Sequence, residues 1–155
     1  MHPNVERVVA ALRDAGATGD ARVLSDSART AAEAATALDC PVGAIVKSLV
    51  FTADGEPLLV LTSGAHTVDT HRLASALDVT TVARADPDTV RSATGFPIGG
   101  VAPVGHPAPL HTVIDTSLGR YDVVWASAGT PHAVFPSTYD ELLRITGGTP
   151  MEVNG

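Results

Sequence analysis

The chain has 155 residues, 45% of them hydrophobic, with a formal net charge of −7 and one cysteine. This length predicts a single domain over residues 1–155, while the acidic charge excludes a broad basic face for DNA or RNA, because phosphate neutralisation supplies most of the affinity of such faces. The lone Cys40 excludes an internal disulfide and a cysteine-based zinc site, and the lack of a long apolar run or signal peptide predicts a cytoplasmic protein with no membrane partner.

Apolar spacing and capping residues predict several elements in the first half of the chain. We expect, in order, a helix over residues 5–12 with a glycine stop at Gly16, a short strand over residues 21–25, a helix over residues 31–38, and a β-hairpin of residues 43–51 and 57–62. Thr30 and Glu33 stand at the spacing of a capping box, which marks the start of the second helix. The hairpin is indicated by the turn at residues 53–56 between its two apolar runs.

The second half of the chain combines helices with further strands. We expect a helix after Asp69 that carries Leu73 and Leu77, a strand over residues 79–83, and a helix from Asp86-Pro87 to Gly95. Two strands should follow, over residues 110–114 and 121–126, joined by a turn at residues 117–119. A strand over residues 133–135 and a last helix, capped by Ser137 with Asp140 and running through Ile145, complete the chain. Strands in hairpin pairs as well as between helices favour an α+β domain with a mixed, largely antiparallel sheet.

Lys47 is the only lysine, against nine arginines, and it lies in the most apolar run of the chain, residues 43–51. In a strand, alternate side chains point to opposite faces, so Lys47 shares a face with Leu49 and Phe51, while Ser48 points the other way. Both faces are apolar, so the ammonium is expected to find hydrogen-bond acceptors, to have a lowered pKa, or to meet an anionic ligand. The alternative is that its stem packs while its amine reaches water at a sheet edge.

The segment of residues 94–109 holds four glycines and four prolines, yet its other residues are largely apolar. Flexible linkers are normally rich in polar residues, so this composition does not predict a linker. We expect this segment to be ordered and to form one wall of a site beside the strand that contains Lys47.

Three segments bear on function: Ile45-Val-Lys-Ser-Leu-Val50, Ser92-Ala-Thr-Gly-Phe-Pro-Ile-Gly-Gly-Val-Ala-Pro-Val-Gly105 and Val124-Trp-Ala-Ser-Ala-Gly-Thr-Pro-His132. Together they resemble the YbaK/ProX family of aminoacyl-tRNA deacylases, which is related to the editing domain of bacterial prolyl-tRNA synthetases. The likeness covers nearly the whole chain, and its specific part is the lysine combined with the glycine-rich loop. Because Ser48 follows Lys47 where the YbaK branch has threonine, the chain is more similar to that branch.

This resemblance implies a compact domain in which a mixed sheet, curled towards a barrel, is flanked by helices. The implied activity is trans-editing, the hydrolysis of the ester of a mischarged tRNA that carries a small amino acid such as cysteine, alanine or serine, with Cys-tRNA(Pro) as the first expectation. The implied partner is the tRNA acceptor end, with an aminoacyl-tRNA synthetase as a possible second partner. No cofactor is implied.

The resemblance also implies roles for individual residues. Lys47 is the functional hallmark, and the Gly-x-x-x-Pro loop from Gly99 to Pro103 lines the substrate site. Our hypothesis is that Lys47 binds the terminal adenosine or the ester, while backbone N–H groups of Gly99, Gly100 and Val101 stabilise the oxyanion. The glycines are explained either by close approach of the backbone to the substrate or by turns with positive φ. Predicted substrate-binding residues are Ser48, Phe96, Pro103, Ser127, Gly129 and His132.

Two rival functions stay open at this stage. The chain carries no serine-histidine-aspartate order, catalytic cysteine pattern or His-Glu-x-x-His motif, which suits an ester hydrolase without a covalent intermediate. One rival is a non-catalytic module that binds an aminoacyl-adenosine or another small ligand and partners a synthetase. The other is a Schiff-base enzyme, since a desolvated lysine can act as a nucleophile.

The six histidines predict no metal site. His106 and His111 lie five residues apart across prolines, and no carboxylate stands at helical spacing from them. His66 and His71 flank a helix start, where we expect both to be solvated.

Overall fold

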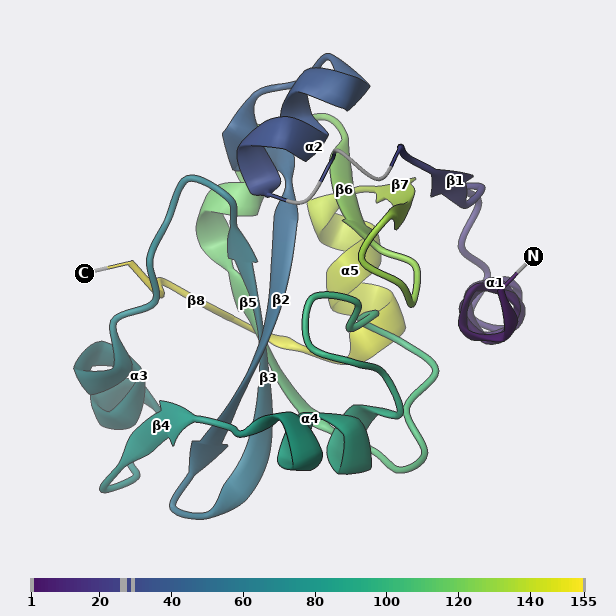
Figure 1. The fold of residues 1–155 in the computed structure, drawn as a ribbon. Coiled ribbons are helices and arrows are strands. Elements are labelled where there is room, and N and C mark those ends of the chain that lie inside the picture. The colour runs from purple at the N-terminus through teal and green to yellow at the C-terminus, as the bar shows by residue number, and fades with distance from the viewer. Residues whose placement is uncertain (1, 26–27, 29, 155) are drawn as a thin grey trace.

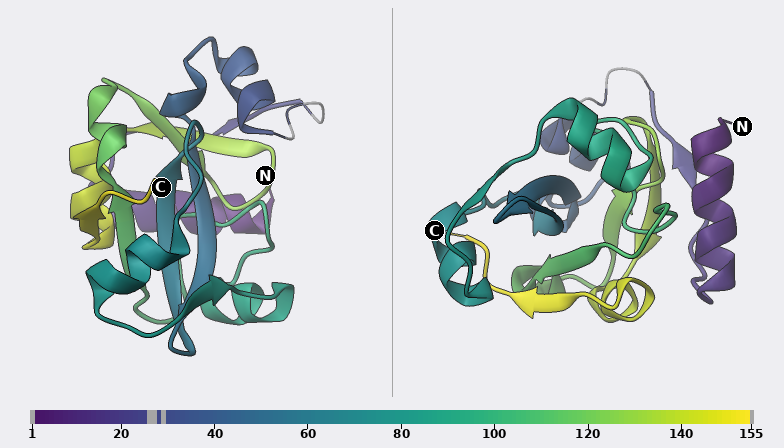
Figure 2. Two further views of the ribbon diagram at one scale, coloured as in Figure 1. Left: turned by 90° about the vertical axis from the view of Figure 1, so that its left-hand side faces the viewer. Right: turned by 90° about the horizontal axis from the view of Figure 1, so that it is seen from below.

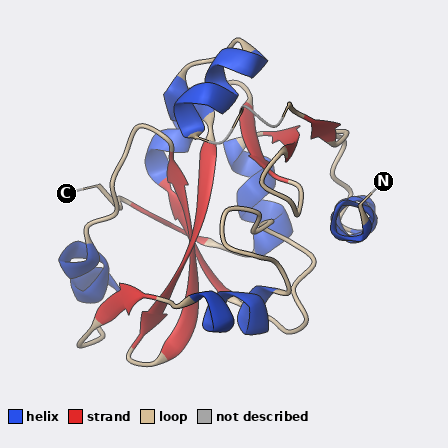
Figure 3. Ribbon diagram, in the orientation of Figure 1, coloured by secondary structure: helices blue, strands red, loops and turns tan. Residues whose placement is uncertain are grey.

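The computed structural model describes residues 2–25, 28 and 30–154, and it has a mixed α+β fold (Figures 1 and 3). Its α-helices are α1 (Pro3–Asp14), α2 (Ala31–Leu38), α3 (Thr70–Leu77), α4 (Pro87–Thr94) and α5 (Tyr139–Thr146). No helix in the described ranges is long and apolar enough to cross a membrane.

The strands form two sheets. A five-stranded sheet has the order β4-β2-β3-β5-β8, with β2 (Val46–Ala53), β3 (Glu56–Ser63), β4 (Val82–Arg84), β5 (His111–Asp115) and β8 (Thr149–Met151). A three-stranded sheet has the order β1-β7-β6, with β1 (Arg22–Val23), β6 (Val124–Ser127) and β7 (Ala133–Ser137). In the larger sheet β2 pairs antiparallel with β3 and β4, whereas β3–β5 and β5–β8 are parallel, so the predicted mixed sheet is confirmed.

The expected barrel-like sheet is not confirmed, because the described strands form no closed barrel. The strands instead divide between two sheets, which meet through one isolated bridge from Ile45 to Trp125. A 3-10 helix over Thr116–Arg120 joins β5 to β6 where a turn at residues 117–119 was expected, and β6 pairs with β7 in the other sheet. Sequence reasoning also missed β8, which has only three residues and follows two glycines.

Capping groups explain where most helices begin. The side chains of Thr30, Asp69 and Asp86 accept hydrogen bonds from backbone amides three residues ahead, as predicted. The prediction for the last helix was one residue off, because Thr138 caps α5. Ser137 instead donates its hydroxyl to the Glu141 carboxylate at 2.6 Å.

The predicted hairpin of β2 and β3 is the longest pairing of the fold, from Val46 opposite Ser63 to Ala53 opposite Glu56. Asp54 and Gly55 form its two-residue turn, and both have positive φ (48° and 87°), as a type I′ turn requires. In Figure 1 these two strands run through the middle of the molecule, with α2 at one end and α3, β4 and α4 at the other.

Two apolar clusters lie on opposite faces of the central hairpin. One contains Val46 and Val50 of β2 together with residues of α1, α4, β6, β7 and the 96–104 segment. The other contains Phe51 of β2 and packs under α3. Helix α1 covers the outer side of the three-stranded sheet, as the right-hand view of Figure 2 shows. Residues of β2 therefore alternate between two buried environments, as the sequence predicted.

Candidate functional site

A cavity of about 290 Å³ lies beside β2. Its walls come from four parts of the fold that are distant in sequence: the start of α2, the β4–α4 corner, the 98–101 loop and the β6–β7 hairpin. The lining residues are Ala28, Thr30, Ala31, Ala34, Ile45, Val46, Lys47, Ser48, Leu49, Val50, Arg84, Ala85, Val90, Ile98, Gly99, Val101, Trp125, Ser127, Pro131, Ala133 and Val134. Small-molecule sites are of this kind, concave and mostly apolar with few polar groups.

The cavity is open to β2 because the strand has a free edge there. On that side, within the described residues, β4 pairs only with Phe51–Ala53, and the bridge to β6 is at Ile45. The Val50 carbonyl accepts a hydrogen bond from the Ala85 amide at 3.1 Å, which shows that the peptide group of Val50 faces the β4 side. Peptide groups two residues apart point the same way in a strand, so the N–H and C=O of Ser48 face the free edge.

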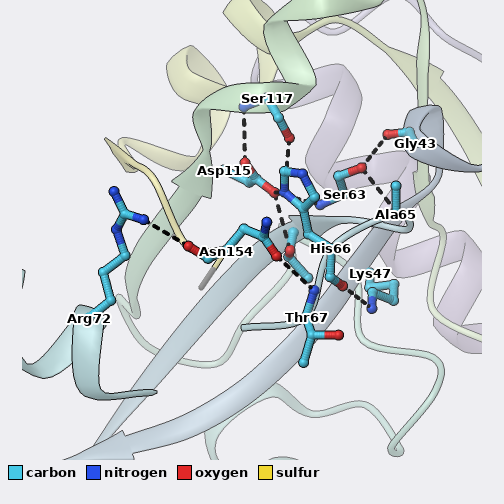
Figure 4. A network of polar contacts seen from close by, with 11 residues as sticks. Gly43, Lys47, Ser63, Ala65, His66, Thr67, Arg72, Asp115, Ser117 and Asn154 are labelled. Atoms are coloured by element: carbon cyan, nitrogen blue, oxygen red, sulfur yellow. Dashed lines mark hydrogen bonds and ion pairs between the residues drawn. The ribbon is translucent and has the colours of Figure 1, made fainter. Parts of the chain in front are cut away.

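Lys47 lines this cavity, and its ammonium is half-buried. The Nζ atom donates a hydrogen bond to the backbone carbonyl of His66 at 2.7 Å, from the loop between β3 and α3 (Figure 4). The prediction of a sheltered lysine that finds an acceptor is confirmed. An ammonium carries three N–H donors, and the single hydrogen bond that it makes within the described chain leaves two for a ligand.

The electrostatic environment of Lys47 disfavours its charged form. Burial lowers the pKa of the Lys47 ammonium below its ordinary value, and the nearby Arg84 guanidinium lowers it further. Arg84 also lines the cavity and lies 5.6 Å from the centre of the Phe51 ring. Arg22 stacks over the Trp125 ring, another lining residue, at 5.0 Å. Among the described residues, Lys47 and Arg84 are thus the two cations that line the cavity of a chain whose net charge is −7.

The hydroxyl of Ser48 is buried and has no hydrogen-bond partner among the described residues. Ser48 lies on the same face of β2 as Val46 and Val50, which line the cavity with it. A buried hydroxyl without a partner costs free energy, about 1–3 kcal/mol by the usual desolvation penalty. Such a group beside a cavity is positioned to bind a polar atom of a ligand.

The 97–100 segment forms a tight turn that explains its two adjacent glycines. The Gly100 amide donates to the Pro97 carbonyl at 3.0 Å, and Gly99 has a φ of 84°, as the third residue of a type II turn requires. A Cβ atom on Gly100 would lie 2.9 Å from the backbone of Thr130. Gly99 is thus explained by its turn and Gly100 by close packing, rather than both by approach to a ligand.

This turn changes the expected set of oxyanion donors. The Gly100 N–H is already used, whereas the N–H groups of Gly99 and Val101 have no backbone hydrogen bond within the described chain. Both of these residues line the cavity, as do Lys47, Ser48 and Ser127 from the predicted site. Five of the ten predicted residues are therefore brought to one cavity.

The other predicted binding residues do not line it. Phe96 is fully buried, with the Arg7 guanidinium 4.3 Å from its ring centre, and Pro103 is buried beside a separate surface pocket. Gly129 accepts a hydrogen bond from the Asn4 side chain at 3.1 Å. His132 is half-buried, and its carbonyl accepts from the Leu24 amide at 2.7 Å. These four residues make contacts within the protein, and their positions do not support direct contact with a substrate.

Sequence reasoning gave no site role to Trp125, Arg84 or His66. The position of Trp125 could have been predicted from the sequence, because the two-residue period of a strand puts Trp125 on the same face as Ser127. No sequence signal marks Arg84. The expectation of a solvated His66 was wrong: its side chain is 21% exposed, and its Nδ1 lies 2.9 Å from Oδ2 of the buried Asp115. His71 is exposed, as expected.

No group of three histidine, cysteine, aspartate or glutamate residues within the described ranges is arranged to hold a metal ion. His106, one of the histidines considered above, contacts the Ala102 carbonyl through Nε2 at 2.8 Å. Burial lowers the pKa of its imidazole.

Comparisons with known proteins identify the family of this chain. Residues 25–145 match the model of the aminoacyl-tRNA editing domain. The proline–tRNA ligase of Desulfovibrio desulfuricans is 32% identical over 133 residues, which cover 83% of this chain and 23% of the ligase. The ligase of Oleidesulfovibrio alaskensis is 36% identical over 106 residues, or 66% of this chain and 18% of the ligase. The chain thus spans about a quarter or less of these relatives.

A solved structure resembles the whole chain. It was described as a proposed trans-editing enzyme for prolyl-tRNA synthetase, with a TM-score of 0.95, 40% identity, and coverage of 100% of this chain and 99% of the other. The match of the family model extends from before α2 to the end of α5, and so includes β2, the 98–101 loop and the β6–β7 hairpin. The chain belongs to the family of aminoacyl-tRNA editing domains.

Proposed function

We propose that this chain is a trans-editing deacylase that hydrolyses the ester bond of a mischarged aminoacyl-tRNA. One observation carries the proposal: Lys47, Ser48, Gly99 and Val101 line the same cavity, and among the described residues the Ser48 hydroxyl has no hydrogen-bond partner and the amides of Gly99 and Val101 have no backbone hydrogen bond. The family membership and the resemblance to a proposed trans-editing enzyme support the same activity. The substrate we propose carries a small amino acid such as cysteine, alanine or serine, with Cys-tRNA(Pro) as the first candidate.

The size of the cavity supports a small aminoacyl group. About 290 Å³ is just below the usual range for small-molecule sites, about 300–1,000 Å³. Alanine residues at positions 28, 31 and 34 form one wall, and the lining is otherwise mainly aliphatic. A cavity of this volume suits the amino acid and the sugar to which it is esterified, while the rest of the acceptor end stays outside.

The proposed chemistry needs no covalent intermediate. Water adds its oxygen to the ester carbonyl carbon, and the carbonyl oxygen becomes an oxyanion. When the oxyanion collapses back to a carbonyl, the bond from that carbon to the ribose oxygen breaks, and a proton lost by the attacking water passes to the ribose oxygen, which leaves as a hydroxyl group. The N–H groups of Gly99 and Val101 stabilise the oxyanion, since preorganised donors in a desolvated site are strong stabilisers. Lys47 uses its free N–H groups to hold the ester region or the terminal adenosine. The Ser48 hydroxyl binds a second polar atom of the aminoacyl group.

The charge distribution supports contact with the acceptor end alone. Lys47 and Arg84 line the cavity and supply positive charge there, whereas the chain as a whole is acidic. A broad contact with the tRNA body would require many more phosphate contacts. A prolyl-tRNA synthetase is the partner we propose for presentation of the tRNA, because the relatives that match this chain are proline–tRNA ligases.

The decisive experiment measures release of amino acid from a panel of charged tRNAs by the wild-type chain and by Lys47→Ala. We expect turnover of a tRNA with a small mischarged residue and a loss of at least about 100-fold in Lys47→Ala, which keeps its fold because the lysine lies in a half-buried site. Arg91→Ala, an exposed change on α4, is the control and should retain full activity.

Three results would overturn the proposal. Near-normal turnover by Lys47→Ala would remove the role of the lysine. Tight binding of aminoacyl-adenosine analogues without turnover of any charged tRNA would favour the non-catalytic binding module. A Schiff base would appear as a covalent adduct after borohydride treatment, and our mechanism predicts none.

A further inference from the structure

The position of the Lys47 ammonium depends on a loop that lies outside the cavity walls. The Nζ atom bonds to the carbonyl of His66, and His66 follows the end of β3 by three residues. A carbonyl can hold an ammonium in place only if the loop that carries it is itself held. The geometry of the 63–67 segment therefore bears directly on where Lys47 points.

The His66 side chain ties this loop to the interior of the protein (Figure 4). Its Nδ1 lies 2.9 Å from Oδ2 of Asp115, at the end of β5. Asp115 is 1% exposed, and the same oxygen accepts hydrogen bonds from the Ser63 amide at 3.0 Å and the Thr62 hydroxyl at 3.2 Å. Its other oxygen accepts from the Ser117 amide at 2.9 Å. A buried carboxylate thus joins β3, β5 and the loop at one point.

A neighbouring serine strengthens the same connection. The Ser63 hydroxyl donates to the Gly43 carbonyl at 2.8 Å and accepts from the Ala65 amide at 3.2 Å. The His66 amide also donates to the Ser63 carbonyl at 3.0 Å. The start of the loop is therefore held by hydrogen bonds of both its backbone and its side chains. The contact of the His66 imidazole with Asp115 is the remaining restraint on the position of His66.

The cluster of Ser117, His66 and Asp115 is not a nucleophilic triad. The Ser117 hydroxyl lies 3.3 Å from Nδ1 of His66, the same nitrogen that faces Asp115. In a triad the histidine uses different nitrogens for the serine and the aspartate, so that a proton can be taken from the serine. The shared nitrogen points to a fixed orientation of the ring rather than to proton transfer from Ser117.

We propose that His66 and Asp115 are positioning residues for the deacylase reaction, which act by fixing the carbonyl that holds the Lys47 ammonium. Neither residue lines the cavity of the proposed site, so they act only through Lys47. This inference rests on the proposed function of Lys47, yet it has a readout of its own. Because Lys47 is the only lysine of the chain, labelling with ¹³C-lysine gives one side-chain signal that reports on its ammonium.

The test combines kinetics with that signal. We expect His66→Ala to lower kcat by about 10–100-fold with little change in KM, since a misplacement of about 1 Å can cost 100-fold. The Lys47 signal should move towards that of a solvent-exposed lysine. His66→Asn, whose amide can put an N–H near the position of Nδ1, should restore part of both. The matched control is His71→Ala, an exposed histidine on α3, which should change neither.

A double-mutant cycle separates positioning from a general structural role. If His66 acts through Lys47, then His66→Ala should cause no further loss in the Lys47→Ala background; if it only supports the fold, the two losses should multiply. Asp115→Asn is expected to resemble His66→Ala, but His66→Ala carries the test because Asp115 is buried and its variant can misfold.

The failure of this inference is distinguishable from failure of the proposed function. An inactive Lys47→Ala together with a fully active His66→Ala and an unchanged lysine signal would overturn the positioning role and leave the deacylase intact. Multiplying losses in the cycle would overturn it as well. An active Lys47→Ala would instead remove the proposed function itself.

Discussion

Lys47 and Ser48 are adjacent in β2, and their side chains leave opposite faces of the strand beside its free edge. Lys47 reaches the His66 carbonyl on one face, while Ser48 lies with Val46 and Val50 on the other. Both residues line the cavity, beside an edge of β2 that no strand covers in the described chain. A strand paired at this edge would fill the space beside them.

Ser48→Ala should separate function from stability. Removal of a buried hydroxyl without a partner is expected to leave the free energy of unfolding unchanged or to raise it by up to about 1 kcal/mol. Activity should fall, by about 10-fold for one lost hydrogen bond to the substrate. Urea unfolding and single-turnover deacylation measure the two effects. A variant that is destabilised but fully active would show that the hydroxyl has a structural partner instead.

The pKa of Lys47 should lie below that of free lysine, because burial and Arg84 both disfavour the charge. In the pH window between the folded and unfolded pKa values the unfolded state binds more protons, so stability should rise with pH there. Titration of the single ¹³C-lysine signal measures the value. Arg84→Gln should raise it, whereas Arg91→Gln on α4 should not; an unmoved pKa in Arg84→Gln would contradict the assigned cause.

A pair of glycine variants tests the turn in the 97–100 segment. Gly99 and Gly55 both have positive φ, 84° and 87°, and a Cβ atom at either would have no neighbour within 4 Å. Gly99→Ala and Gly55→Ala should therefore lose similar stability, about 1 kcal/mol each. Only Gly99→Ala should lower deacylation, since Gly55 lies in the remote hairpin turn. Equal activities would argue against the Gly99 N–H as an oxyanion donor.

Asp115 should contribute to acid sensitivity. Burial alone would raise the pKa of this carboxyl, but hydrogen bonds from Ser63, Ser117 and His66 outweigh it and lower the pKa. Its stabilising contribution is thus present above the unfolded value of about 3.9 and is lost as the pH falls through the folded value. Between pH 5 and pH 2 the wild type should lose more stability than Asp115→Asn, as thermal unfolding would show. Parallel curves would contradict a lowered pKa.

Deacylation should depend weakly on salt. Among the described residues, the cations that line the cavity are Lys47 and Arg84, so few counterions should be released on binding of the acceptor end. A plot of log kcat/KM against log salt concentration is expected to have a slope no steeper than about −3. A much steeper slope would indicate an extended tRNA contact elsewhere on the chain. Arg144→Gln, an exposed change on α5, should leave the slope unchanged.

The sequence alone determined the local features of this protein. These features follow from interactions within a few residues, so the sequence pattern predicts them directly. They are the helix caps at Thr30, Asp69 and Asp86, the hairpin turn at Asp54-Gly55, and the alternation of side chains along β2. The family was recognisable for a related reason, since the lysine and the glycine-rich loop are short contiguous motifs.

Only the tertiary structure decided which strands share a sheet, where β2 is left unpaired and what surrounds Lys47. The division into two sheets, the Arg84 charge at the cavity and the bond from Lys47 to His66 join residues far apart in the chain. The Asp115 connection spans 49 residues to His66, and neither residue carries a local signal of its partner. Such contacts depend on how apolar faces pack together, and the free energy of that packing is a property of the whole fold.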